Sequence, residues 1–286
     1  MSTPRSSALL QIRHITGFAY DGTAESSYNE ARMTPLALPR QRVIDALLSV
    51  HPKALQSTYR DYFDTIVTTF DLHEPHDRLE VVAEATVETF AESPLQPSIP
   101  FSLLHVPSLV DVFAEYLAPT PRTTMSSVVL GELGEIVAPS EDIHETVQTV
   151  MTWVRERVTY VRGSTLVSST AEEVWTQRQG VCQDLTHVTI ALLRSLGIPA
   201  RYVSGYLHPD ADAGVGEVVT GESHAWVEYY CGDWVGIDPT NGSSIGVQHV
   251  IVAKGREYGD VPPLKGIYHG GPSSSLGVVV EITRIG

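Results

Sequence analysis

Apolar and polar positions alternate along most of the first 95 residues with the period of a β-strand. The clearest stretch is 79–90, where every second residue is apolar, at Val81, Ala83, Ala85 and Val87. Residues 59–70 also read as a strand, and the turn-rich HEPHD segment separates the two. Residues 40–50 fit either a strand or a helix. We therefore predict a β-rich N-terminal region, in which we find no nucleophile paired with a base.

Helical periodicity begins after a proline-rich stretch at 93–107. We predict a helix over 141–157, capped by Ser140, with an apolar stripe at Ile143, Val147, Val150, Met151 and Val154. Thr170 and Glu173 have the capping-box spacing for a short helix that ends near Gly180. The change of pattern predicts two domains, 1–95 and 96–286, with a boundary somewhere in 91–140.

The helix expected after Cys182 is apolar on most of its faces, with leucine or valine at Leu185, Val188, Leu192 and Leu196. Gly197 and Pro199 end it. A helix of this kind is buried. Strands are predicted to follow at 200–207, 223–230, 234–239, 247–253 and 276–284.

Composition and charge narrow the function classes. The 286-residue chain carries a formal charge of −15, which argues against a nucleic-acid partner. No apolar run approaches the ~20 residues that cross a bilayer, and the first residues lack the apolar stretch of a secretory signal. We therefore expect a cytoplasmic protein with no membrane partner. We also expect no metal and no cofactor, because the two cysteines, Cys182 and Cys231, show no metal-ligand spacing.

Cys182 is the residue with the clearest chemical potential. A thiol at a helix N-terminus faces unpaired N–H groups and the positive end of the helix dipole, and both favour the thiolate. The same N–H groups can hold an oxyanion. Cysteines are more often small buried hydrophobes, however, and position alone does not separate the two readings.

His224 and Asp238 supply the other two groups that a thiol nucleophile needs. Their strands form a hairpin whose loop length decides which faces they occupy. A two-residue loop puts the two side chains on opposite faces. A three-residue loop places Tyr230 opposite Trp234 and makes Asp238 the diagonal neighbour of His224, within reach of a hydrogen bond. A catalytic triad of Cys182, His224 and Asp238 therefore requires the odd loop.

Other polar residues have simpler interpretations. Asp184 and His187 lie near Cys182 but are expected to be buried hydrogen-bonding groups, since His187 lies about 140° around the helix from the thiol. His73 and His76 lack a third ligand and indicate a solvated turn. The loop 208–222 fits an active-site flap and a disordered surface loop equally well. A Cys182–Cys231 disulfide is conceivable but would remove the nucleophile.

These residues resemble the transglutaminase-like superfamily, in its bacterial branch with a β-rich N-terminal domain. The resemblance is carried by YVRGSTLVSSTAEEV, RQGVCQDLTHVTIALLRSLGIPARYVSGYL, SHAWVEYY, DWVGIDPTNG and GREYGDVPPLKGIYHG. It is looser in the N-terminal LPRQRVIDALLSVHP, and Asp64-Thr65 stands where relatives tend to have a Gly-Asn turn. It implies an α+β, papain-like core in which a nucleophile helix packs on an antiparallel sheet. The catalytic residues of the family fall on Cys182, His224 and Asp238.

The sequence therefore predicts a cysteine acyl-transfer enzyme that acts on a peptide or a glutamine carboxamide through a thioester. Its partner would be a peptide or protein substrate; its oligomeric state is left open. Water needs no dedicated site to resolve the thioester, which favours hydrolysis slightly over transfer to an amine. The alternatives are a non-catalytic scaffold that keeps the fold and, more weakly, a redox-sensing thiol with Cys231 as its partner.

Overall fold

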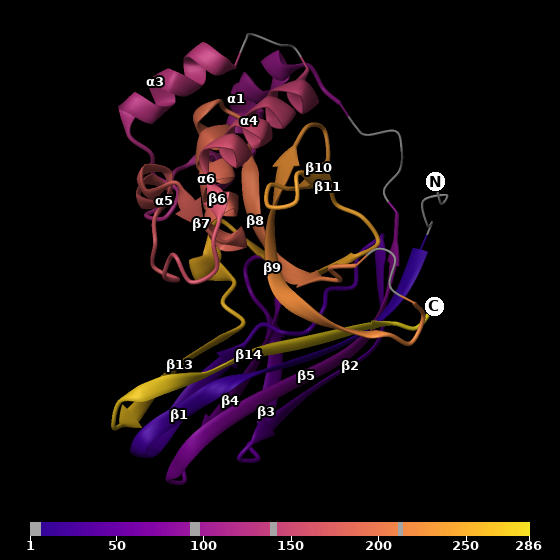
Figure 1. Ribbon diagram of the computed structural model, residues 1–286, viewed down its shortest axis with the longest axis vertical. Coiled ribbons are helices and arrows are strands. Elements are labelled where there is room, and N and C mark those ends of the chain that lie inside the picture. The colour runs from indigo at the N-terminus through magenta and orange to yellow at the C-terminus, as the bar shows by residue number, and fades with distance from the viewer. Residues whose placement is uncertain (1–6, 92–97, 138–141, 211–213) are drawn as a thin grey trace.

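The computed structural model describes residues 7–91, 98–137, 142–210 and 214–286. It has the expected α+β class, with the helices gathered at one end and the long strands at the other (Figure 1). The N-terminal strands are β1 (Ser7–Ala31), β2 (Gln41–His51), β3 (Gln56–Arg60), β4 (Ile66–Leu72) and β5 (His76–Phe90).

The helical part consists of η1 (Phe101–His105), α1 (Pro107–Val112), α2 (Ala114–Leu117), α3 (Ser127–Ile136), α4 (Ile143–Arg157), α5 (Ala171–Gln177) and α6 (Cys182–Ser195). Two short strands, β6 (Thr159–Tyr160) and β7 (Gln179–Gly180), pair in parallel just before α6. The remaining elements are β8 (Ala200–Leu207), β9 (Val218–Tyr230), β10 (Trp234–Asp238), β11 (Ser243–Ser244), β12 (His249–Gly255), η2 (Tyr258–Asp260), β13 (Leu264–Gly270) and β14 (Ser273–Arg284).

Strand β9 joins the two halves of the molecule into one sheet. Its first part, 218–221, pairs with β14 in the N-terminal half, and its second part, 222–229, pairs with β8. The last two strands of the chain, β13 and β14, both pair with β1 and lie beside it in Figure 1. The division into 1–95 and 96–286 stays a prediction, while the C-terminal strands belong to the N-terminal sheet.

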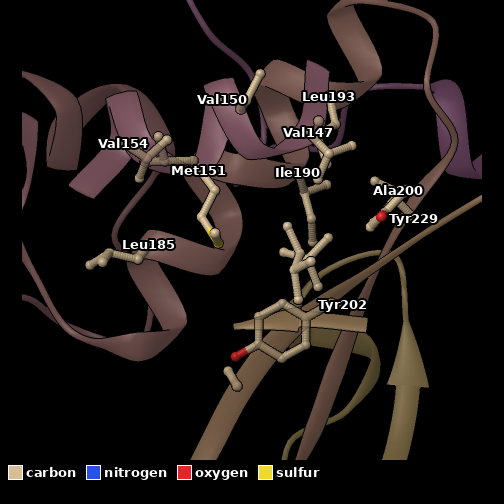
Figure 2. Close-up of a cluster of buried hydrophobic side chains, with 14 of the residues drawn as sticks. Val147, Val150, Met151, Val154, Leu185, Ile190, Leu193, Ala200, Tyr202 and Tyr229 are labelled. Carbon is tan, nitrogen blue, oxygen red and sulfur yellow. The ribbon is translucent and has the colours of Figure 1, made fainter. Parts of the chain in front are cut away.

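The main core lies between α6, α4 and one face of the β8–β9 sheet. Figure 2 shows Tyr202 of β8 packed among aliphatic side chains of these helices. The apolar surface of α6 is buried along almost its whole length, as its sequence predicts. Gly197 follows the helix with φ +80°, a conformation that favours glycine, and so ends α6 where expected. This packing fixes the position of Cys182, the first residue of α6.

Several local predictions are confirmed and others are corrected. Residues 41–50 lie in strand β2, and Thr170 makes the predicted capping box. The single strand expected over 59–70 is two strands, β3 and β4, because Asp64 takes a left-handed turn conformation between them (φ 64°). Ser140 lies outside the described residues, and the side chain of Asp142 caps α4 instead.

The loop predicted over 208–222 is shorter than expected. Residues 218–222 are part of β9 and pair with β14 and β8, so they do not belong to a loop. Residues 211–213 of the predicted loop lie outside the described residues. The turn at His73 and His76 is also less solvated than predicted. His76 is buried and contacts Ser27 Oγ at 3.3 Å, whereas His73 lies against the ring of Tyr28.

Among the described residues, no helix is long and apolar enough to cross a membrane.

Candidate active site

The β9–β10 hairpin has the three-residue loop on which the sequence argument depended. Tyr230 pairs with Trp234 across residues 231–233, and the pairing continues to Val227 and Ile237. The predicted register is therefore confirmed. Continued along the strands, it sets His224 diagonally across from Asp238.

His224 and Asp238 form a short hydrogen bond between buried side chains. Nε2 of His224 lies 2.7 Å from Oδ2 of Asp238, and the two residues are 5% and 0% exposed. Both lie deep enough for the bond to be shielded from water, which strengthens it. The two residues that the sequence selected therefore meet in the structure.

Asp238 accepts hydrogen bonds at both carboxylate oxygens. Oδ1 receives the backbone N–H groups of Thr240 and Asn241, at 2.9 and 3.1 Å. Oδ2 receives Asn241 Nδ2 at 2.7 Å, in addition to His224. Burial raises the pKa of this carboxyl, but the bonds from His224 and its neighbours outweigh burial and hold the pKa far below its usual range. Asp238 is therefore a fixed negative charge under the ring of His224.

The other side of the His224 ring meets the thiol of Cys182. Burial lowers the pKa of the imidazole, but the hydrogen bonds to Asp238 and Cys182, with their charges, raise it to about 9. Nε2 is bound to Asp238, which leaves Nδ1 to face the sulfur. With this raised pKa, His224 is a positively charged neighbour of the sulfur at neutral pH.

Cys182 is the first residue of α6, as predicted, and is partly exposed. The backbone before it is held by Asp184, whose Oδ2 accepts from Val181 N at 2.8 Å and from Thr165 Oγ1 at 2.5 Å. Gly180 lets this turn close, because a Cβ there would lie 2.8 Å from the Cβ of Asp184. Asp184 thus has the buried hydrogen-bonding role that we predicted.

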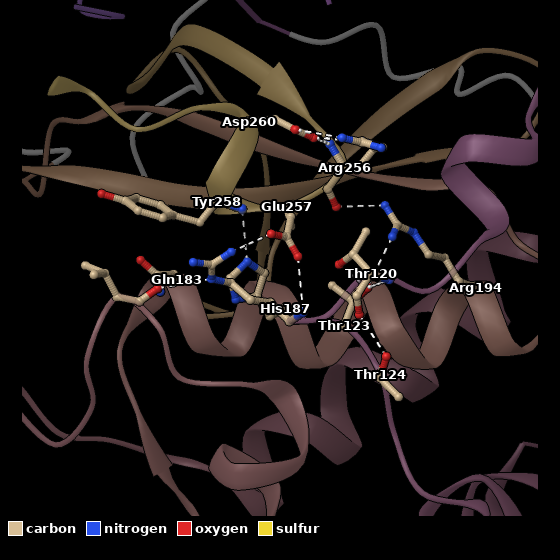
Figure 3. A network of polar contacts seen from close by, with 12 residues as sticks. Thr120, Thr123, Thr124, Gln183, His187, Arg194, Arg256, Glu257, Tyr258 and Asp260 are labelled. Carbon is tan, nitrogen blue, oxygen red and sulfur yellow. Dashed lines mark hydrogen bonds and ion pairs between the residues drawn. The ribbon is translucent and has the colours of Figure 1, made fainter. Parts of the chain in front are cut away.

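His187 also has the predicted buried role, and a network around it ties α6 to the turn after β12. Its Nε2 accepts from Tyr258 N at 3.1 Å, and burial lowers its pKa to about 3. Nearby, Arg194 donates to Arg256 O, and Arg122 pairs with Glu257. Figure 3 shows the contacts that His187 and Arg194 of α6 make with residues 256–258. The network fixes the nucleophile helix from the side away from the thiol.

Sequence reasoning missed His249, the first residue of β12. Its Nδ1 accepts from Gly246 N at 3.2 Å, so its proton is on Nε2, which donates to Asp238 Oδ2 at 3.3 Å. Only the pairing of β12 with β8, next to β9, brings it to the site. A histidine within the strand predicted over 247–253 was the one signal in the sequence.

His224, Asp238 and His249 also form a group whose atoms lie close enough to hold a metal ion. Each histidine Nε2 is engaged with Asp238 Oδ2. A metal at this point would have to displace both of those protons. The hydrogen-bond network accounts for the convergence of these three side chains.

Two cavities border the site. One, of about 480 Å³, includes His224 in its lining, together with residues of the β6 and β10 ends and of the segment after β8. A larger one, of about 750 Å³, lies between the N-terminal strands and β9, β10 and β12. His249 lines both cavities, and Cys182 lines neither. Neither cysteine is in a disulfide, and Cys231 is buried in the hairpin turn.

Comparison with known proteins agrees with this architecture. The family described as the transglutaminase-like superfamily matches residues 133–239, and the bacterial transglutaminase-like N-terminal region matches residues 10–88. The uncharacterized protein ML0607 of Mycobacterium leprae is 42% identical over 276 residues, covering 96% of this chain and 99% of its own length. The uncharacterized protein Rv2569c of Mycobacterium tuberculosis is 31% identical over 303 residues, covering 95% of this chain and 91% of its own length.

Among solved structures, a candidate cysteine protease from Cytophaga hutchinsonii has the same fold. It matches with a TM-score of 0.78 and 22% sequence identity, covering 99% of this chain and 92% of its own. The fold, the two matched regions and the full-length relatives lead to one conclusion: the chain belongs to the transglutaminase-like superfamily.

Proposed function

We propose that this protein is a thiol acyl-transfer enzyme that acts on a peptide bond or a glutamine carboxamide, with Cys182, His224 and Asp238 as its catalytic residues. The observation that carries the proposal is the His224 ring. It is bound on one side to a buried carboxylate and on the other to a thiol at a helix N-terminus. This is the arrangement in which a thiol nucleophile works.

The chemistry follows from the atoms that meet. The sulfur of Cys182 attacks the carbonyl carbon of the amide, forming a C–S bond, while His224 holds the thiol proton. The C–N bond then breaks, and the leaving nitrogen takes the proton from His224. Water or an amine then attacks the thioester carbon, and His224 takes the proton of the attacking group. The C–S bond breaks, the acyl group leaves as the acid or the new amide, and His224 returns the proton to the sulfur. Asp238 keeps the ring oriented and stabilises its charge throughout.

The same geometry supports a place for the oxyanion. Backbone N–H groups at the start of α6 have no helical partner, and they point toward the end of the helix that carries Cys182. The carbonyl oxygen becomes negative when sulfur attacks, and these donors would hold it. We infer hydrolysis as the default outcome, because water requires no second binding site. We keep a cytoplasmic place of action as a prediction, to be tested by cell fractionation.

Alkylation kinetics test the proposal directly. Iodoacetamide should modify Cys182 in the wild type with a pH profile unlike that of an ordinary thiol. His224→Ala should restore the ordinary profile, and Cys182→Ala should remove the labelling. His269→Gln, which changes an exposed histidine on β13, is the matched control. An ordinary profile in the wild type that His224→Ala leaves unchanged would reject the enzyme in favour of a scaffold.

A second assay distinguishes the reactions. Ammonia release from glutamine peptides, measured with and without a primary amine, separates deamidation from cross-linking. Cleavage of a peptide mixture, followed by mass spectrometry, reports hydrolysis of the backbone. Each activity should be lost in Cys182→Ala.

A further inference from the structure

The cavity of about 480 Å³ beside His224 has a polar lining that the proposed triad does not use. Its lining includes Arg162, His208, Thr240, Asn241 and Gln248, together with the triad histidine. Among the described residues that line it, none is an aspartate or a glutamate. That is notable in a chain with 34 acidic residues and 19 basic ones. The cavity therefore favours a negatively charged or oxygen-rich ligand.

Two polar atoms in this lining are buried and have no hydrogen-bond partner: Nε2 of His208 and Oγ1 of Thr240. The protonation of His208 is fixed by its other nitrogen. Nδ1 accepts from Asp210 N at 3.3 Å, so the proton is on Nε2, which is a donor. His208 is only 2% exposed. A buried donor without an acceptor is costly, and a ligand oxygen would remove that cost.

The position of the cavity indicates which part of a substrate it would hold. Tyr160 lines it and pairs with Gly180, two residues before Cys182, so the cavity adjoins the nucleophile. Cys182 itself is not in the lining, whereas His224 is. The acyl carbon must lie on the sulfur, and the nitrogen of the amide must lie at His224, which protonates it. The group beyond that nitrogen therefore extends from His224 into the cavity.

We propose that this cavity binds the amine component of the reaction and selects one that carries a carboxylate. The proposal rests on the proposed function and names its substrate class. In hydrolysis, the amine that leaves the amide bears a carboxylate; in transfer, the amine that attacks the thioester bears one. His208 Nε2 and Thr240 Oγ1 donate to the carboxylate oxygens. The carboxylate is either a free chain terminus or an acidic side chain.

Partitioning of an acyl-enzyme tests this without knowledge of the natural acyl group. p-Nitrophenyl acetate acetylates Cys182 and releases p-nitrophenolate. The thioester is then divided between water, which gives acetate, and an added amine, which gives the N-acetyl product. Glycylglycine presents a terminal carboxylate, aspartic acid α-amide a side-chain carboxylate, and glycylglycinamide none. All three are compared at equal concentrations of free amine.

We expect at least one carboxylate-bearing amine to capture the acetyl group five-fold or more better than glycylglycinamide. Better capture by glycylglycine would identify a chain terminus as the source of the carboxylate, and better capture by aspartic acid α-amide would identify an acidic side chain. His208→Asn retains an acceptor for Asp210 N but lacks the Nε2 donor, so it should bring the preference close to one. His208→Gln places an amide nitrogen where Nε2 was and should keep most of it. His269→Gln should match the wild type. Equal capture of all three amines, or an unchanged preference in His208→Asn, would overturn the proposal.

A binding measurement separates this proposal from the proposed function. In Cys182→Ala, glycylglycine or aspartic acid α-amide should shift the ring resonances of His208, whereas glycylglycinamide should not. A shift in a protein whose wild type shows no p-nitrophenolate burst would retain the cavity and reject the triad. A burst without any selective shift would retain the triad and reject the cavity.

Discussion

Replacing Asp238 with asparagine should lower the pKa of His224 steeply. The carboxylate gives the imidazole both a 2.7 Å hydrogen bond and a negative charge, and together with Cys182 these raise its pKa from 6.5 to about 9. Burial acts in the opposite direction. In Asp238→Asn the charge of the carboxylate is lost while the contact with Cys182 stays, so burial should bring the pKa of His224 well below 9. At pH 7.5 the protonated fraction, about 97% with a pKa of about 9, should fall accordingly.

The same change has a consequence for stability. A rise from 6.5 to about 9 corresponds to about 3 kcal/mol, at roughly 1.4 kcal/mol for each pH unit. Because the folded-state pKa lies above the unfolded-state value, this contribution is present in full below pH 6.5 and is lost as the pH rises through 9. The wild type should therefore lose about 3 kcal/mol of unfolding free energy from this group over that interval, and Asp238→Asn should not.

Ring resonances of the eleven histidines, followed by NMR from pH 5 to 10, give the measurement. The signal of His224 is assigned from His224→Gln. Urea unfolding at pH 6.5 and 9.5 tests the stability difference. Asp233→Asn is the matched control, since Asp233 lies in the turn of the same hairpin and its Oδ1 accepts from the backbone N–H of Trp234. A His224 pKa in Asp238→Asn within half a unit of the wild-type value would refute the reasoning.

Three other experiments test separate parts of the structure. His249→Phe removes a donor to Asp238 and should slow acetylation of Cys182 by p-nitrophenyl acetate about ten-fold, as expected for a hydrogen bond worth ~1.4 kcal/mol. His249→Gln should recover most of the rate. A His249→Phe rate within two-fold of wild type would contradict this role of His249. Gly205→Ala should destabilise the fold by about 3 kcal/mol in urea unfolding, because its Cβ would lie 2.0 Å from Val250 O. Gly134→Ala, on the exposed face of α3, should instead stabilise the fold by up to about 1 kcal/mol. Equal effects of the two substitutions would contradict the close packing at Gly205. Limited iodoacetamide should label Cys182 and leave Cys231, which is 0% exposed, until the protein is denatured; peptide mapping that finds both labelled at one rate would contradict the burial.

The sequence by itself determined the features that depend on neighbours along the chain. The alternation in β5, the capping box at Thr170 and the apolar surface of α6 all arise from local periodicity, and the structure contains each of them. Side chains in a strand alternate with a period of two, so the loop length of the β9–β10 hairpin decides whether His224 and Asp238 meet. The three-residue loop brings them together.

Tertiary structure alone decided which distant segments meet. The pairing of β9 with β14 and β8, of β12 with β8, and of β14 with β1 joins residues far apart in the chain, and no local pattern encodes those choices. His249 reaches Asp238, and His208 and Thr240 reach one cavity, only because these pairings exist. Local periodicity specifies which face of an element is buried. The partner of that face is set by the competition among all the apolar surfaces of the chain for burial, which only the folded molecule resolves.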